Sequence, residues 1–279
     1  MSRVRTGPVL GLTAQTVLLA GLAATVGLDV AGWLAGLGYG VVTCVALQRG
    51  LRRRGVDRLG PADRVTLARG VLVGGVTALV VTGFSGPTPL SVLVPMTAVA
   101  LALDAVDGWV ARRTGTASAL GARFDMEVDA FLILVLSVQV APVVGPWVIA
   151  IGGLRYAFVV AGWLLPWMRG TLPPRFWRKV VAATQGVLLL VVAADVLARP
   201  VTAVLAAVSL ALLVESFGHD VGWLWWHRST RPTPAVAPTS ATPVPVALVP
   251  SVVALPSVPS VRPRVDAVTD RSFVAHQPV

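Results

Sequence analysis

The order of apolar and polar residues divides the chain into long hydrophobic runs joined by short polar loops. Each run has about twenty residues, the length at which a helix crosses the hydrocarbon core of a bilayer. The pattern predicts eight spans, at residues 9–28, 30–48, 64–84, 90–112, 119–141, 144–167, 177–198 and 201–226. We therefore expect an all-α integral membrane protein.

The basic residues of the loops predict how these spans are oriented. They gather in three loops and include Arg49, Arg52, Arg53, Arg54, Arg58 and Arg64, then Arg112, Arg113 and Arg123, then Arg169, Arg175, Arg178 and Lys179. With eight spans the three loops lie on one side, and the positive-inside rule makes that side cytoplasmic. We expect a multi-pass protein of a bacterial cell membrane with both termini inside.

The composition agrees with a membrane setting and narrows the partners. Of the residues, 55% are hydrophobic and 13% are charged, and the mean hydropathy is +0.78. Many of the basic residues behind the net charge of +10 are arginines in short loops beside apolar spans. Arginines in such loops usually contact anionic lipid headgroups, so the charge does not require a nucleic-acid partner. We expect membrane lipids as partners and no nucleic acid. The single cysteine, Cys44, supports neither a disulfide framework nor a zinc site.

Three parts follow from this pattern. Residues 1–58 form a two-span extension, residues 59–228 form a six-span core, and residues 229–279 are rich in Pro, Val, Ser and Thr without helical or strand periodicity. A segment of that composition buries no core, so we expect a disordered cytoplasmic tail. The second span has small residues every four positions, which either pack the two extra helices or form a homodimer contact. These residues are Gly32, Gly36 and Gly40.

Four aspartates lie where the fourth span ends and the fifth begins. Asp104 and Asp107 are three residues apart, and Asp125 and Asp129 are four apart, so on helices each pair shares a face. Ionisable groups beside a membrane are costly and usually functional. Because four close carboxylates repel one another, they require cations, and an all-oxygen ligand set suits Mg²⁺ or Mn²⁺.

The spacing of this cluster is more specific than its charge. From Asp104 the order is Asp-x2-Asp-Gly-x2-Ala-Arg-x8-Gly-x3-Asp-x3-Asp, which resembles the signature of the CDP-alcohol phosphotransferase family. The segment PADRVTLAR also resembles the start of that family's first core helix, where Asn, Thr and Arg recur at intervals of three. Thr66 and Arg69 fit this second pattern, whereas Asp63 stands where Asn is common.

The resemblance implies transfer of a phosphatidyl or other substituted phosphoryl group from a CDP-activated lipid to an alcohol, with release of CMP at the cytoplasmic face. It implies a metal-binding cluster of Asp104, Asp107, Asp125 and Asp129, in which Asp129 is also the general base. The residues expected to contact the CDP-lipid are Asp63, Thr66, Arg69, Gly108, Ala111, Arg112, Ser118 and Gly121.

The acceptor alcohol is predicted from basic residues outside this motif. Arg155 within a span, with Arg175, Arg178 and Lys179 at the following loop, predicts a positive pocket for a polyol phosphate. Arg155 paired within the bundle and loop arginines acting as topology anchors are the alternatives. Glycerol phosphate, inositol phosphate, inositol and serine all stay open as acceptors.

Two other functions use acidic clusters in membranes. A cation-coupled transporter would place charges near the midplane of several spans, whereas these acids crowd one edge. A non-catalytic membrane scaffold would be favoured by a missing motif aspartate, and all four are present. The spacing therefore favours the transferase.

Overall fold

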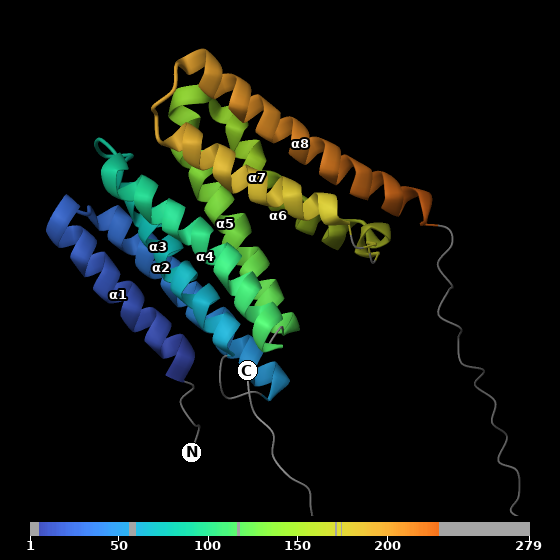
Figure 1. The fold of residues 1–279 in the computed structure, drawn as a ribbon, viewed down its shortest axis with the longest axis horizontal. Helices are drawn as coiled ribbons and strands as arrows, with labels where there is room; N and C mark the ends of the chain where they lie inside the picture. Colours follow the sequence, from blue (N-terminus) through green and yellow to red (C-terminus); the bar gives the residue numbers. More distant parts are fainter. Residues whose placement is uncertain (1–5, 56–59, 116–117, 171, 174, 229–279) are drawn as a thin grey trace, which may run out of the picture. The chain divides into compact units, whose positions relative to one another are not determined.

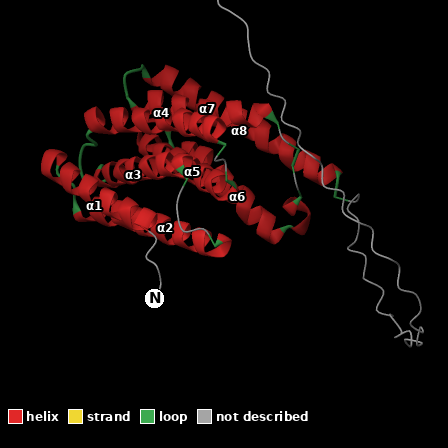
Figure 2. Cartoon of the chain, turned by 60° about the horizontal axis from the view of Figure 1, so that its bottom comes forward, coloured by secondary structure: helices red, strands yellow, loops and turns green. Residues whose placement is uncertain are grey.

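The computed structural model describes residues 6–55, 60–115, 118–170, 172–173 and 175–228, and every regular element in these residues is a helix (Figures 1 and 2). Eight α-helices and two 3₁₀ turns follow one another along the described chain. They are α1 Thr6–Val26, α2 Val30–Arg54, α3 Pro61–Thr82, α4 Leu90–Thr114, α5 Ala119–Val144, η1 Pro146–Val148, α6 Ile149–Leu164, η2 Pro166–Arg169, α7 Phe176–Ala193 and α8 Arg199–Trp226.

The eight expected spans are confirmed. All eight helices are long and apolar enough to cross a membrane, so the chain is an integral multi-pass membrane protein. The sixth helix is shorter than the sequence pattern predicted. Pro146 and Pro166 turn its two ends into the 3₁₀ segments η1 and η2, because proline lacks the N–H that continues an α-helix.

Helix α3 is the central element of the bundle. Of its most apolar stretch 67% is buried within the protein, against at most 39% for any other span. The outer helices therefore leave large apolar side chains such as Leu10, Val17 and Leu34 exposed. Exposed apolar faces on long helices are expected where lipid replaces water as the solvent.

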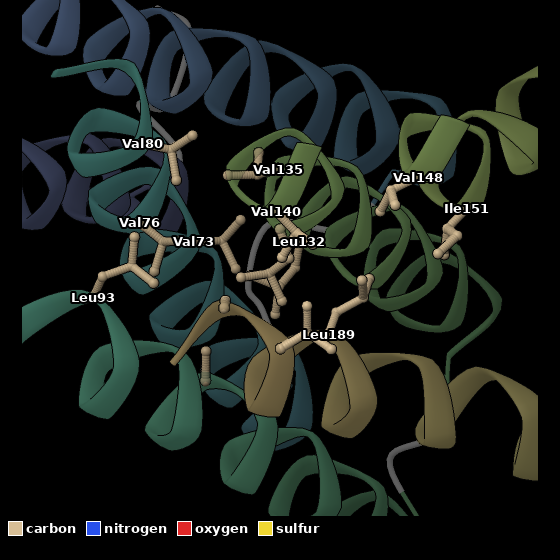
Figure 3. Close-up of a cluster of buried hydrophobic side chains, with 14 of the residues drawn as sticks. Val73, Val76, Val80, Leu93, Leu132, Val135, Val140, Val148, Ile151 and Leu189 are labelled. Carbon is tan, nitrogen blue, oxygen red and sulfur yellow. The ribbon is translucent and has the colours of Figure 1, made fainter. Parts of the chain in front are cut away.

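The buried core joins α3 to the helices on both sides of it (Figure 3). Val73 of α3 points toward Leu132 of α5, Val76 lies beside Leu93 of α4, and Leu189 of α7 belongs to the same cluster. Interdigitated valine and leucine side chains at this density fix the relative positions of packed helices. The elements that bear the four aspartates are thus held by a packed core.

The two N-terminal helices pack on α3 through small residues. A Cβ atom at Gly32 would overlap Thr82 of α3, and one at Gly36 would meet Leu19 of α1 and Ala78 of α3. The third residue of this stripe, Gly40, faces Gln15 of α1. The stripe therefore packs within the chain, and it is not available for the homodimer contact that was the alternative.

Asp29 connects the N-terminal hairpin to the far end of α3. Its carboxylate accepts a hydrogen bond from the Gly32 N–H at 2.7 Å and so caps α2. It also accepts from the Thr82 hydroxyl at 2.9 Å and the Ser85 hydroxyl at 3.0 Å. Helices α1 to α8 belong to one compact unit. The predicted tail, residues 229–279, lies outside the described residues.

Candidate active site

Helix α3 begins, α4 ends and α5 begins at the same end of the bundle (Figure 1), and the four aspartates lie in the second half of α4 and the first half of α5. One carboxylate oxygen from each of Asp104, Asp107 and Asp125 lies within 4.8 Å of the other two. Asp129 stands one helical turn further along α5 from Asp125. Spacings of three on α4 and four on α5 place each pair on a common face, as the sequence predicted.

Arg69 of α3 lies in the middle of the aspartates. Its side chain is fully buried, and its two terminal nitrogens pair with Asp104 and Asp125. The same guanidinium lies 3.6 Å from Asp107 and 3.2 Å from Asp129. Since a guanidinium presents several donors in one plane, a single arginine can contact all four carboxylates.

One arginine does not balance four carboxylates. If all four are ionised, Arg69 compensates one of four negative charges and leaves three. The side chains of Asp104, Asp125 and Asp129 are each exposed by about a third, whereas Asp107 is buried. The uncompensated charge therefore faces an accessible side. Convergent hard oxygen donors with excess negative charge fit a divalent cation such as Mg²⁺ or Mn²⁺.

Thr66 supports the buried member of the cluster. Its hydroxyl lies 3.1 Å from an oxygen of Asp107 and donates to it, and the whole Thr66 side chain is buried. Thr66 and Arg69 are three residues apart on α3, so both side chains reach the aspartates from the same face. The two upstream residues that fit the family pattern thus contact the aspartates themselves.

Asp63 caps its own helix instead of pointing at the cluster. Its Oδ2 atom accepts the backbone N–H of Gly60 at 3.2 Å, which satisfies one free N–H at the start of α3. Its other oxygen lies against Gly121 of α5, where a Cβ atom would overlap it. Gly121 therefore permits a close approach between α3 and α5, and Ser118 caps α5 by accepting the Gly121 N–H at 2.8 Å.

Three motif residues lie on the last turns of α4. Gly108 is partly buried and follows Asp107 directly. Ala111 and Arg112 belong to α4, but their side chains lie outside the described part of the structure.

Arg155 does not stand alone in its span. Its Nη2 atom lies 2.6 Å from Oε1 of Glu127, which comes between Asp125 and Asp129 on α5. The sequence interpretation did not single out Glu127. The available signal was Arg155 itself, since a charge within a span usually has a partner of opposite charge on a neighbouring span.

The remaining basic residues lie around the start of α7. Arg178 pairs with the buried Asp220 of α8 at 3.5 Å and donates to the Pro173 carbonyl. Arg175 has a buried Nη1 atom without a hydrogen-bond partner among the described residues. Lys179 is exposed. Trp177 donates to Glu215 at 2.7 Å, so α7 and α8 are joined by two polar contacts at this end.

Comparison with known families agrees with this geometry. The model of a family described as CDP-alcohol phosphatidyltransferase matches residues 60–215, more than half of the chain. The chain belongs to this family of membrane transferases of phosphate groups. The match includes all four aspartates and Arg69, and it begins after α1 and α2. Neither curated proteins nor solved structures gave a match.

Proposed function

We propose that this protein transfers the phosphatidyl group of a CDP-activated lipid such as CDP-diacylglycerol to an alcohol and releases CMP. The observation that supports this most is the convergence of three carboxylates within 4.8 Å at the motif of a phosphatidyltransferase family. In this reaction the alcohol oxygen forms a bond to the lipid-bearing phosphorus. The bond from that phosphorus to the CMP oxygen breaks, and CMP leaves with the electron pair.

Asp104, Asp107 and Asp125 would hold Mg²⁺ or Mn²⁺. When bound, a divalent cation withdraws charge from the pyrophosphate and makes the phosphorus a better target for a hydroxyl. Thr66 orients Asp107 for this role through its hydrogen bond. Arg69 fixes the carboxylates of Asp104 and Asp125 relative to each other, because its guanidinium pairs with both.

Asp129 would take the proton of the acceptor alcohol. It lies outside the three-carboxylate group but within 3.2 Å of Arg69, which fixes its side chain. Its side chain is 36% exposed, so a substrate hydroxyl can reach it. A general base needs this combination of a fixed position and access to the reacting proton.

The CDP-lipid would lie between α3, α4 and the start of α5. Gly108 would leave room for the nucleotide, Gly121 lets Asp63 of α3 approach α5 closely, and Arg112 would pair with phosphate oxygens. Asp63, Thr66, Ala111 and Ser118 would line the same space. Asp63 and Ser118 are both engaged at helix starts, so their contribution would be to fix those starts beside the nucleotide.

The acceptor would approach from α6 and α7. Arg175 has an unsatisfied buried nitrogen and Lys179 is exposed, so both offer donors to an anionic group. Arg155 and Arg178 have acidic partners within the chain, Glu127 and Asp220. An acceptor phosphate would therefore share or replace these carboxylates. This arrangement supports a phosphorylated polyol over a neutral alcohol.

We also propose that this end of the bundle lies at the cytoplasmic face of a bacterial membrane. The loops at this end carry the arginines that the positive-inside rule assigns to the cytoplasm, and CMP is released to the same side.

Purified protein with CDP-diacylglycerol and Mg²⁺ tests the proposal when it is given a panel of alcohols. We expect CMP release with at least one acceptor, and faster release with a polyol phosphate than with the parent polyol. Arg155→Ala should raise KM for that acceptor more than for the CDP-lipid. CMP release with no acceptor of the panel above the rate without enzyme would contradict the proposal.

A further inference from the structure

Helices α1 and α2 lie before the family match, which begins at residue 60, yet α2 reaches the candidate active site. The ring of Tyr39 on α2 stacks on Phe131 of α5 with 4.7 Å between centroids and 22° between planes. Phe131 is two residues from Asp129. A side chain from the added helices thus packs on α5 within two residues of the aspartate assigned to proton transfer.

A second contact joins α2 to the start of α5. A Cβ atom at Gly50 of α2 would overlap the Leu120 side chain, so these two helices touch closely there. Asp125 and Asp129 lie between Leu120 and Phe131 in the sequence of α5. The turns of α5 that bear both aspartates are therefore flanked by two contacts with α2.

Tyr39 also faces the helix that bears Arg69. Its hydroxyl would lie 3.8 Å from a Cβ atom placed on Gly70, which is ordinary van der Waals contact. Tyr39 thus contacts α5 with its ring, and its hydroxyl end lies close to Gly70 of α3.

The position of α2 is itself fixed by α3. Asp29 and Gly32 bind the far end of α2 to Thr82, and Gly36 packs on Ala78. A helix that is held at one end by polar contacts and along its length by close packing moves little, so it restricts the movement of the residues packed against it. The stack of Tyr39 on Phe131 therefore rests on a rigid support.

We propose that Tyr39 is a positioning residue for the transfer reaction. Its ring holds α5 at the rotation and depth where Asp129 faces Arg69 and Asp125 faces Asp104 and Asp107. This inference rests on the proposed function, and it gives the two added helices a part in catalysis. Aromatic stacking supplies this role, because offset rings resist sliding and rotation.

The test compares kcat and KM for purified variants of the full chain. Tyr39→Leu should lower kcat by about ten- to hundredfold, the range expected when a reacting group shifts by a fraction of an ångström to one ångström, with KM for the CDP-lipid nearly unchanged. Tyr39→Phe keeps the aromatic ring and should retain most of the wild-type kcat. The control is Leu19→Ala, which removes a fully buried side chain from the α1–α2 contact away from α5.

The partner residue gives an independent reading if Tyr39→Leu does not fold. Phe131→Leu should lower kcat to a similar extent, and the double variant should lose no more than either single variant. Unchanged kcat in both single variants overturns the proposal, as does a loss no larger than that of Leu19→Ala in folded protein. A loss in Tyr39→Phe equal to that in Tyr39→Leu also overturns it, since the ring would then play no part.

The two proposals fail in different ways. If the wild-type protein releases no CMP from the CDP-lipid, the proposed function is wrong. If the wild-type protein is active and Tyr39→Leu keeps its kcat, only the role of Tyr39 is wrong.

Discussion

The Nη2 atom of Arg69 lies 3.2 Å from Oδ1 of Asp129, and the same guanidinium contacts the three converging aspartates that we propose as metal ligands. Arg69 is therefore the common neighbour of the residues assigned to cation binding and of the residue assigned to proton transfer. A fully buried cation in this position lowers the repulsion between the carboxylates. It also fixes their side chains relative to one another.

Removing this charge should destabilise the fold. Arg69→Met keeps most of the volume but leaves four carboxylates without their buried partner, and such losses cost about 3–5 kcal/mol of unfolding free energy. Thermal unfolding in detergent measures the effect. The matched control is Arg113→Met, an exposed arginine whose guanidinium lies 4.5 Å from the Trp109 ring, where the loss should be about 1 kcal/mol or less. Equal unfolding midpoints for Arg69→Met and the wild type would contradict the role of Arg69.

Substitutions within the cluster should separate two roles. Asp107→Asn and Asp125→Asn remove metal-ligand charge and should weaken the binding of both Mg²⁺ and the CDP-lipid. Asp129→Asn removes the base, so turnover should fall while CDP-lipid binding is largely kept, because a base acts mainly in the transition state. Binding titrations and single-turnover kinetics measure the two quantities separately. Near-normal turnover in Asp129→Asn would refute its role as the base.

Asp29 should make stability depend on pH at the opposite end of the bundle. The hydrogen bond from the Gly32 N–H, followed by that from Thr82, holds the pKa of Asp29 below its usual value of 3.8. A lowered carboxylate pKa contributes stability that is fully present above the unfolded-state pKa and is lost as the pH falls through the folded-state value.

The variant that isolates this charge is Asp29→Asn, since asparagine is also a good helix N-cap. The stability difference between wild type and Asp29→Asn should be constant above about pH 5 and shrink below about pH 4. Thermal unfolding across this pH range measures it. A difference that stays the same down to pH 3 would show that the carboxylate charge contributes nothing.

Two neighbouring glycines of α6 provide a matched test of helix packing. A Cβ atom at Gly152 would lie 2.8 Å from the backbone nitrogen of Leu134 and 2.9 Å from its Cβ, whereas one at Gly153 would meet nothing within 4 Å. Gly152→Ala should therefore push α6 away from α5 and cost about 1–3 kcal/mol. Gly153→Ala should leave stability unchanged or raise it by up to about 1 kcal/mol, because alanine favours helix.

The readout for this pair is the unfolding midpoint of each variant in the same detergent. Since both variants make the same chemical change on one helix, detergent effects and helix propensity cancel in their comparison. Equal midpoints would mean that α5 and α6 are not packed as closely as described.

The spans and the acidic motif could be predicted because both depend on local sequence. A run of about twenty apolar residues forms a helix in a lipid bilayer, and all eight predicted runs are helices in the structure. The spacing of Asp104, Asp107, Asp125 and Asp129 fixed their helix faces in the same way. The ends of α6 were missed, since Pro146 and Pro166 convert the last turns to 3₁₀ geometry inside an unbroken apolar run.

Contacts between distant spans could not be predicted from one sequence. Arg69 was expected to contact the CDP-lipid, but its partners in the structure are 35 and 56 residues away, at Asp104 and Asp125. The Arg155–Glu127 pair and the Tyr39–Phe131 stack are likewise set by how antiparallel helices align. That alignment depends on close packing at residues such as Gly36 and Gly152. The sequence pattern does not predict which residues of other helices pack against these glycines.

The central claim is that the aspartate cluster performs a metal-dependent transfer from a CDP-activated lipid. The most direct test measures CMP and lipid product together, with purified protein, CDP-diacylglycerol and the best acceptor of the panel. Equal amounts of CMP and lipid product should form with Mg²⁺ or Mn²⁺, and neither should form in excess chelator or with folded Asp107→Asn protein. Undiminished CMP release by the wild type in excess chelator, or by Asp107→Asn with Mg²⁺, would contradict the claim.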